Sequence, residues 1–513
     1  MHGAEVRDAT PIGPRPQKIL RATLIARMAA TLLALGFALA QLAAWPARLR
    51  YPGELDLVEG MPLAEMVHLR QGRPIYAPAS IHGYDAANFG PLYYVLGAHL
   101  IDPQQPAYFP LRVLSIFGTL GCAAGCGLMS FWLSRKYLAA LLASLLFLSF
   151  AFVTRHGTSA RPDAAALSLM FAGFLVAYHF RGRAAMLWAA PLMMLGFYYK
   201  QQFVAAPLAI LIYLFIEKRY RLAAEFAGLM ILGGLALLAH FQFVLFSGQD
   251  FFLHFVTYNV LLFAKFNLLA GLAFFGLVLF LPSLVGLEFV RVSGDKLLGC
   301  YLICAIVLSL LTVARSGSDS YYFLEPALIT SCLFGALFAT RATDPASSRE
   351  LLALLAVTVF LGQWGGGQSP SPGAFQQDRA VQDYLRQRFA PGTPALSYYV
   401  GDMVRAGLST PVTNVYHYSF LIRKRTLSDR DLIRQIEDHS FGVVAVGFDL
   451  QSEEGTIWAD HYLTRSVRDA IRSEYQLVDR LKMPRPERVR EPGWLYFWIP
   501  KTGSRTDERV VRP

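Results

Sequence analysis

About eleven apolar runs divide residues 1–364 of this chain, and the polar segments between them alternate in character. Basic clusters follow every second run, at Arg135, Arg181, Lys218, Arg291 and Arg341. Because loops rich in Lys and Arg stay on the cytoplasmic side of a membrane, the alternation predicts about eleven transmembrane helices and a cytoplasmic N-terminus. The composition agrees, since 54% of the residues are apolar and 16% are charged. The expected fold is an all-α multi-pass membrane protein.

The composition changes abruptly after the last apolar run. Residues 365–377 are rich in Gly, Ser and Pro, which is typical of a linker, and residues 378–513 resemble a soluble domain. Expected helices alternate there with expected strands, the helices over 378–389, 428–439 and 463–473 and the strands over 395–400, 442–447 and 494–499. The pattern predicts a small extracytoplasmic α/β domain behind a transmembrane domain (1–364) whose first outer loop is 46–109.

The charge and the cysteines exclude several classes of partner. The net charge of +11 arises from clusters that orient spans and meet anionic membrane lipids, and no nucleic-acid-binding motif occurs. The five cysteines lie in apolar runs without the matched ligand spacing that zinc needs. No glycine-rich phosphate loop follows any expected strand, so a nucleotide co-substrate is not indicated. No cofactor is assigned, and dependence on a divalent metal is left open.

Three carboxylates, Glu54, Asp56 and Glu59, lie in the first outer loop just after the first apolar run. A carboxylate at a membrane interface, with its pKa raised by partial burial, is suited to take a proton from an acceptor hydroxyl. Glu59 precedes a short amphipathic segment that is expected to rest on the interface and to hold the Glu59 carboxylate over a cavity. Glu54 is expected to be solvated. The alternative is an acidic loop that only shapes the membrane boundary.

Isolated basic residues lie at the outward ends of other runs. Arg161, Lys200 and Arg315 are placed where a phosphate headgroup would lie, and a departing phosphate needs compensating positive charge. Snorkelling or ordinary lipid contact is the alternative for each of them. Asp163 follows Arg161 at an expected helix start, where a carboxylate also serves as a cap.

Four short motifs follow the acidic loop, each near an outward end of an apolar run: Gly90-Pro-Leu-Tyr-Tyr94, Arg161-Pro-Asp163, Tyr199-Lys-Gln201 and Tyr322-Phe-Leu-Glu-Pro326. In this order the motifs resemble those of the GT-C membrane glycosyltransferases. The resemblance covers most of the membrane part. It is closest to the branch that includes the protein O-mannosyltransferases and the aminoarabinose transferase.

The resemblance implies a plasma-membrane (bacterial inner-membrane) enzyme that transfers a hexose or pentose from a polyprenyl-phosphate carrier, with inversion. The acceptor would be a hydroxyl or amine of a glycan, lipid or protein on the outer face. The resemblance also implies a first-loop carboxylate as base, but Val58 stands where a second acid would precede Glu59, so the base is Glu59 or Asp56. Asp163 joins these catalytic candidates, and the expected substrate-binding residues are Arg161, Lys200, Arg315, Tyr322 and Tyr94.

Two other classes of function are compatible with a chain of this kind. A transporter or flippase for a lipid-linked or polar substrate would show repeated halves and broken helices at mid-membrane, and the sequence shows neither. A non-catalytic scaffold for envelope assembly would use the C-terminal domain as its interaction module. Loss of activity without loss of assembly on changing Glu59 would separate an enzyme from a scaffold.

Overall fold

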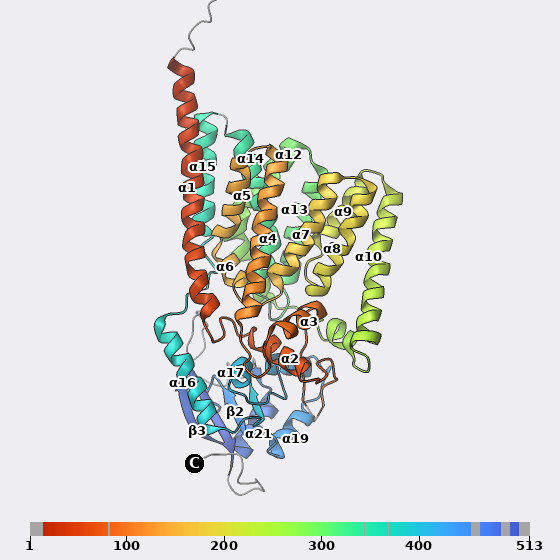
Figure 1. The fold of residues 1–513 in the computed structure, drawn as a ribbon, viewed down its shortest axis with the longest axis vertical. Helices are drawn as coiled ribbons and strands as arrows, with labels where there is room; N and C mark the ends of the chain where they lie inside the picture. The colour runs from red at the N-terminus through yellow and green to blue at the C-terminus, as the bar shows by residue number, and fades with distance from the viewer. Residues whose placement is uncertain are drawn as a thin grey trace, which may run out of the picture.

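The computed structural model describes residues 14–80, 83–342, 344–367, 369–452, 462–483 and 493–501. Every apolar run singled out in the sequence is helical (Figure 1). The helices are α1 (Pro14–Arg50), α4 (Phe109–Ser134), α5 (Tyr137–Ser149) with α6 (Ala151–Gly157), α7 (Asp163–Phe180), α8 (Arg183–Tyr199), α9 (Ala205–Ile216), α10 (Tyr220–His240) continued by η1 (Phe241–Leu245), α11 (Lys265–Phe274) continued by η3 (Phe275–Leu279) and α12 (Phe280–Ser293), α13 (Lys296–Val313), α14 (Leu324–Arg341) and α15 (Pro345–Leu361).

Not all of these helices are long enough to span a bilayer straight across. Within the described residues seven have the necessary length and hydropathy, or eight if α5 and α6 count as one span bent by 72°. The helices α8 and α15 have 17 residues each and α9 has 12. They pack beside the longer helices in one bundle (Figure 1). The chain is therefore a multi-pass membrane protein.

The basic clusters gather at one end of the bundle, away from the sheet (Figure 1). Ion pairs join the loops there. Arg181 pairs with Asp295, Lys296 pairs with Glu217 at 2.8 Å, and an Arg341 guanidinium lies 3.1 Å from a carboxylate oxygen of Glu288. The loops that carry these clusters thus share one side, which is the arrangement that their alternation along the chain requires.

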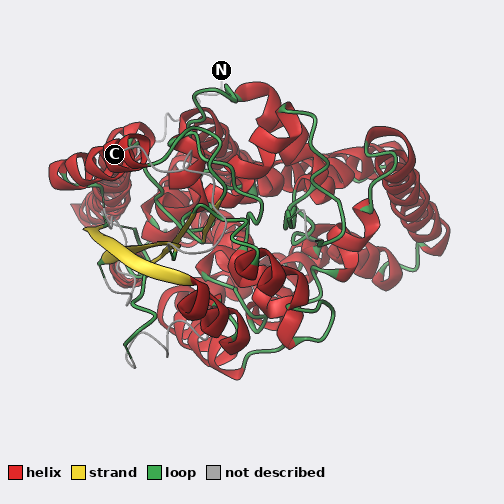
Figure 2. Cartoon of the chain, turned by 90° about the horizontal axis from the view of Figure 1, so that it is seen from below, coloured by secondary structure: helices red, strands yellow, loops and turns green. Residues whose placement is uncertain are grey.

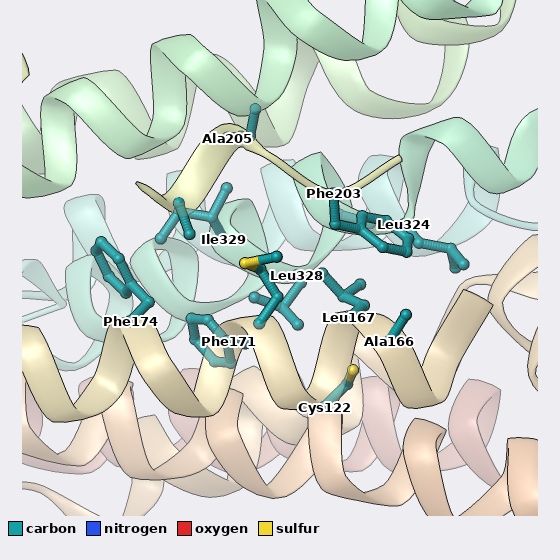
Figure 3. Close-up of a cluster of buried hydrophobic side chains, with 14 of the residues drawn as sticks. Cys122, Ala166, Leu167, Phe171, Phe174, Phe203, Ala205, Leu324, Leu328 and Ile329 are labelled. Carbon is teal, nitrogen blue, oxygen red and sulfur yellow. The ribbon is translucent and has the colours of Figure 1, made fainter. Parts of the chain in front are cut away.

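Helix α14 is the centre of the bundle, since nearly all of its residues are buried inside the protein. Small residues permit this close packing, because a Cβ on Gly335 would lie 2.6 Å from the Ala139 carbonyl oxygen of α5. Figure 3 shows the apolar contacts on another side of α14, where Leu328 and Ile329 face Phe171 of α7. The core that holds the outer loops in place is thus made of side-chain packing between α4, α5, α7 and α14.

The C-terminal part is an α/β domain, as the sequence predicted. Its sheet has the order β1-β2-β4-β3, with β1 parallel to β2 and the other neighbours antiparallel. Seen from below, the strands lie toward one edge of the molecule (Figure 2). The elements are α16 (Pro372–Arg388), β1 (Ala395–Ser397), α17 (Val400–Arg405), α18 (Val415–Arg423), α19 (Arg430–Glu437), β2 (Val443–Val446), α21 (Arg465–Glu474), β3 (Tyr475–Lys482) and β4 (Trp494–Pro500).

Two details of this domain differ from the sequence expectation. Helix α16 begins at Pro372, so it takes in part of the segment 365–377 that was expected to be a linker. Ser371 supplies the reason, because its side chain caps the helix by accepting the N–H of Ala374. Strand β3 was not expected. It continues directly from α21 without a turn residue, so no local signal separates the two elements.

Helices α2 (Gly60–Arg70) and α3 (Pro91–Leu100) form a layer between the bundle and the C-terminal domain (Figure 1). The sequence predicted that α2 would rest on the membrane interface, but the helix is largely buried because α3 and α17 cover it. Hydrogen bonds fasten the C-terminal domain to the first outer loop, from Tyr84 N to Pro411 O at 2.7 Å and from Thr413 Oγ1 to Glu65 Oε1 at 3.0 Å. The first outer loop and the C-terminal domain are therefore held together, and both can line the same cavity.

Candidate active site

A cavity of about 810 Å³ lies between the outer ends of the helices and the C-terminal domain. The first outer loop contributes Asp56, and the segment before α7 contributes Arg161. The rest of the lining comes from the loop after α8, from the segments around 259–267 and 315–322, and from the C-terminal domain, including Lys200, Gln201, Lys265, Arg315, Tyr321, Tyr322, Tyr398, Asn414, Tyr416 and Tyr462. Its size is in the range of ligand-binding sites.

Alternating charges run along one wall of this cavity. Arg161 Nη1 lies 2.9 Å from Asp56 Oδ2, and Arg161 Nε lies 3.0 Å from Asp163 Oδ2. Asp163 uses its other oxygen to pair with Lys200. The Tyr321 ring lies beside both cations, with its centroid 4.3 Å from the Arg161 guanidinium carbon and 4.2 Å from Lys200 Nζ. Three sequence motifs that lie far apart in the chain thus meet at one place.

Close backbone approaches bring these motifs together. Gly118 of α4 faces the start of α7 so closely that a Cβ there would collide with the backbone of Ala165. Gly90 makes a similar approach to the Tyr198 carbonyl at the end of α8, two residues before Lys200. Tyr93 of the same motif donates from its hydroxyl to Ala160 O at 2.8 Å, next to Arg161. The Gly90–Tyr94 motif therefore acts by positioning Arg161 and Lys200.

The charges shift the pKa values of the groups outside the spans. Burial raises the pKa of Asp56, but the charges of Arg161 and Arg155, together with hydrogen bonds from Val58 and Arg161, outweigh burial. The pKa therefore lies below its ordinary value, opposite to the rise expected from the sequence, and Asp56 is ionised at neutral pH. Burial lowers the pKa of Lys200 to about 8, with Asp163 opposing that shift. Lys200 is therefore mostly a cation at neutral pH but close to its titration range.

Glu59 is placed differently from the sequence expectation, because it does not line the cavity. Its carboxylate is fully buried and pairs with Arg112, with Oε1 and Oε2 3.0 Å and 2.6 Å from the guanidinium nitrogens. The same oxygens accept the backbone N–H groups of Leu55 and Ala160. A carboxylate with both oxygens engaged in this way joins the first loop to α4 and to the segment before Arg161.

Glu54 is also not where the sequence predicted, since it is half-buried beneath the C-terminal domain rather than solvated. Its Oε1 accepts the Gly401 N–H at 2.9 Å and the Tyr108 hydroxyl at 3.3 Å. Burial raises the pKa of Glu54, and the neighbouring Asp402 carboxylate adds to that shift. Glu54 therefore belongs to the contact between the first loop and the C-terminal domain.

The other predicted residues divide into two groups. Arg315 and Tyr322 line the cavity, and Asp163 lies directly behind Arg161 and Lys200. Tyr94 does not line it; the Tyr94 ring is buried against Phe89, and its hydroxyl accepts the Phe89 N–H at 3.3 Å. Tyr94 therefore has a packing role.

Sequence reasoning missed two residues that matter to the site. Tyr321 contacts both cations, although only its neighbour Tyr322 was singled out in the motif. Arg112 was overlooked because it falls inside an apolar run, yet a charged residue in the first turn of a span is itself a signal that a partner is present. Among the described residues no group of three or more His, Cys, Asp or Glu side chains is arranged to hold a metal ion.

Comparisons with known proteins place this fold. No protein-family model matches the sequence, and no curated protein does. The crystal structure of ArnT from Cupriavidus metallidurans bound to undecaprenyl phosphate matches with a TM-score of 0.54 and 11% identity, over 90% of this chain and 97% of that one. The apo state of the same protein matches with a TM-score of 0.52 and 10% identity, over 92% and 98% of the two chains.

A crystal structure of the Archaeoglobus fulgidus oligosaccharyltransferase, in complex with Zn and sulfate, matches with a TM-score of 0.44 and 13% identity, over 89% of this chain and 71% of that one. The match to ArnT extends over nearly the whole length of both proteins. It confirms the expected fold, a bundle of membrane helices followed by a smaller α/β domain, and shows that this chain shares its fold with ArnT.

Proposed function

We propose that this protein transfers a hexose or pentose from a polyprenyl-phosphate carrier to an acceptor hydroxyl or amine. The observation that carries the proposal is the run of charges Asp56, Arg161, Asp163 and Lys200 along the cavity wall. It provides both a carboxylate for the acceptor and cations for the phosphate. The shared fold with ArnT, whose structure was solved with undecaprenyl phosphate, supports a donor of that kind.

The cations of the cavity suit a phosphate that leaves with negative charge. Arg161 and Lys200 are held by Asp163 from behind, so their positions are fixed before a ligand arrives. Arg315 donates to the Asn259 carbonyl and Lys265 is exposed, and both line the same cavity. Among the described residues of the lining, four cations stand against one carboxylate, Asp56, and Asp163 lies behind two of these cations. The described groups therefore leave an excess of positive charge for an anionic donor.

The carrier chain would enter from the side of the bundle. Lys265 and Ala264 line the cavity, and the side chains around them are strongly exposed, with Leu262 at 48%, Phe263 at 63% and Phe266 at 76%. Exposed apolar and aromatic residues at the outer end of membrane helices are typical of a contact with lipid. A polyprenyl tail would therefore remain in the bilayer while its phosphate reaches Arg315 and Lys200.

The reaction would be a single displacement at the anomeric carbon. The acceptor oxygen or nitrogen forms a bond to that carbon, and its proton passes to the Asp56 carboxylate. The bond between the anomeric carbon and the phosphate oxygen breaks, and its electron pair stays with the polyprenyl phosphate, which Lys200 and Arg161 stabilise. Attack opposite to the leaving group inverts the configuration. Asp56 is preferred over Glu59 as the base because Asp56 lines the cavity.

The test is transfer by the purified full-length protein. Decaprenyl-phosphate hexose and pentose donors, tritiated in the sugar, are supplied with an envelope extract as acceptor, and nucleotide sugars without polyprenyl phosphate serve as the control. Label should pass to the acceptor from at least one lipid donor, with release of decaprenyl phosphate. Transfer from a nucleotide sugar alone, or no turnover of any lipid donor, would refute the proposal.

We also propose that the cavity and the C-terminal domain face outward from the plasma membrane and that the N-terminus is cytoplasmic. The gathering of the basic clusters at the opposite end supports this orientation. Tyr137 is 83% exposed at the basic end, and Gln451 is exposed in the C-terminal domain. A membrane-impermeant maleimide should label Gln451→Cys in intact cells and Tyr137→Cys only after permeabilisation. The reverse pattern would invert the orientation.

A further inference from the structure

We infer that the acceptor is a saccharide, bound by its uncharged ring against Tyr416 and Tyr462 at the end of the cavity that the C-terminal domain forms. This inference rests on the proposed function, because it names the class of acceptor for that reaction. It starts from a contrast within the described lining of the cavity: aromatic residues lie on both sides, but the Lys and Arg side chains all come from the side of the bundle.

The aromatic end has the shape of a corner. Tyr416 and Tyr462 have ring centroids 5.8 Å apart and planes inclined by 61°. Tyr398 stacks behind Tyr462, with centroids 4.5 Å apart and planes inclined by 15°, and Phe448 stacks on Tyr398. Tyr416 and Tyr462 are half-buried, whereas Tyr398 and Phe448 are buried. Tyr416 and Tyr462 thus meet edge to face, Tyr398 supports Tyr462 by stacking, and all three tyrosines line the cavity. Aromatic surface of this kind suits a ligand ring with C–H groups on one face.

Among the described residues that line this end, the polar groups other than the tyrosines are Asn414 and His417, and both are uncharged, while the Arg423 charge acts on Tyr416 from outside the lining. Asn414 uses its Oδ1 to cap α18, accepting the His417 N–H at 2.9 Å, and no described residue bonds its Nδ2. His417 has both ring nitrogens engaged, by the Tyr84 hydroxyl at 2.7 Å and the Tyr258 carbonyl at 3.1 Å, and burial lowers its pKa to about 4. Neutral hydrogen-bonding groups beside aromatic rings match a polyhydroxyl ligand better than an ionic one.

The corner adjoins the cationic side of the cavity. A Cβ on Gly317 would lie 3.6 Å from a ring carbon of Tyr416, so the turn that carries Arg315 rests against this tyrosine. Lys424 of the C-terminal domain donates to Val260 O at 2.8 Å, which fastens α18 to the segment leading to Lys265. A saccharide in the corner would therefore have a hydroxyl directed toward the donor side, where Asp56 lies in the same lining.

A peptide acceptor fits this end less well. Extended peptides are commonly bound by adding a strand to the exposed edge of a sheet. The edge strands here are β1 and β3, and neither contributes to the described lining of the cavity. Part of the β1 edge is already used, since Ala395 N donates to Ser409 O at 2.8 Å. The lining consists instead of side chains from loops and from α18.

The class of acceptor is tested with the full-length protein and a tritiated decaprenyl-phosphate hexose or pentose. The envelope extract is divided into an untreated, a protease-digested and a periodate-oxidised portion, because periodate cleaves the vicinal diols of saccharides. Transfer should survive protease and be lost after periodate. Transfer that is lost after protease and survives periodate would overturn the saccharide in favour of a protein acceptor. Absence of any donor turnover would instead refute the proposed function, and the inference with it.

Variants of Tyr416 test whether the acceptor binds at this corner of the cavity. Tyr416→Ala should raise the apparent KM for the protease-digested portion about tenfold, while Tyr416→Phe, which keeps the ring, should change it by about twofold or less. The Kd for undecaprenyl phosphate should be equal in both variants. Tyr384→Ala is the matched control, since Tyr384 is a partly buried tyrosine of α16 outside the cavity lining. An unchanged KM in Tyr416→Ala, or an equal rise in Tyr384→Ala, would remove the corner from the acceptor site.

Discussion

Two carboxylate–arginine pairs in the first outer loop have the same chemistry and different surroundings. Asp56 pairs with Arg161 at 2.9 Å, and Glu59, three positions further along, pairs with Arg112 at 2.6 Å. The Asp56 side chain is 12% exposed and lines the cavity, whereas Glu59 and Arg112 are completely buried. The identity of the paired groups therefore does not separate a pair at the cavity from a pair buried within the fold.

The two pairs are distinguished by the other groups that each arginine contacts. Arg112 donates its remaining N–H groups to backbone carbonyls, including Arg48 O at 3.0 Å and Gly53 O at 2.6 Å, so it closes the end of α1 onto α4. Arg161 instead shares Asp163 with Lys200 and faces the cavity. The Arg112 pair therefore joins backbone segments inside the fold, whereas the Arg161 pair belongs to a group of side-chain charges at the cavity.

The largest expected effect is on activity, from Asp56→Asn. The amide keeps the size of the side chain but cannot accept the acceptor proton, so transfer should fall by about 10² to 10⁴-fold. The protein should remain folded, because Arg161 keeps its bond to Asp163. The measurement is transfer from a lipid-linked sugar at matched protein levels, with the thermal midpoint of each sample. Transfer at the wild-type rate would exclude Asp56 as the base.

Glu59→Gln should change stability rather than chemistry. The amide group would turn a donor toward the Arg112 guanidinium and leave a buried charge unpaired, which costs about 3 to 5 kcal/mol. We expect a marked drop in the thermal midpoint in detergent, and activity per folded molecule close to that of the wild type. The double variant Glu59→Gln with Arg112→Gln should lose less than the sum of the single variants. A stable Glu59→Gln protein without activity would reverse the roles of the two acids.

Lys200→Gln should weaken donor binding by a smaller factor. One charge-assisted contact to phosphate is worth about 1.5 to 3 kcal/mol, which corresponds to an increase of about 10- to 150-fold in the Kd for undecaprenyl phosphate. Lys136 provides the control, because it is a cation at the opposite, basic end of the bundle, where it donates to Ala339 O. Equal losses in Lys200→Gln and Lys136→Gln would show that the effect is one of net charge and not of this contact.

Some features of this protein were predictable from its sequence and others were not. The helices and the α/β domain were predictable from the sequence, because hydropathy, loop charge and turn composition act locally. The positions of Glu59 and Asp56 relative to the cavity were not predictable, because they depend on Arg112 of α4 and on Arg161 of the segment before α7, which lie far from the loop in the sequence. Tyr94 was misplaced for the same reason. Its motif is positional, acting through Gly90 and Tyr93 on the ends of neighbouring helices, and a motif alone does not distinguish positioning from contact.

The smallest expected effect is the pH dependence of donor binding, which distinguishes Lys200 from the carboxylates of the site. Burial lowers the pKa of Lys200 to about 8, so its charge is present below pH 8 and is lost as the pH rises through that value. Asp56, whose pKa is lowered, stays ionised throughout this range. Binding of a polyprenyl-phosphate sugar, whose phosphodiester does not titrate here, should weaken by about a quarter between pH 6.5 and 7.5 and be about tenfold weaker at pH 9 than at its low-pH plateau. Lys200→Arg should remove that decline, because a guanidinium stays charged. A decline that persists in Lys200→Arg would assign the titration to another group. The pH dependence of donor binding would then not report on Lys200.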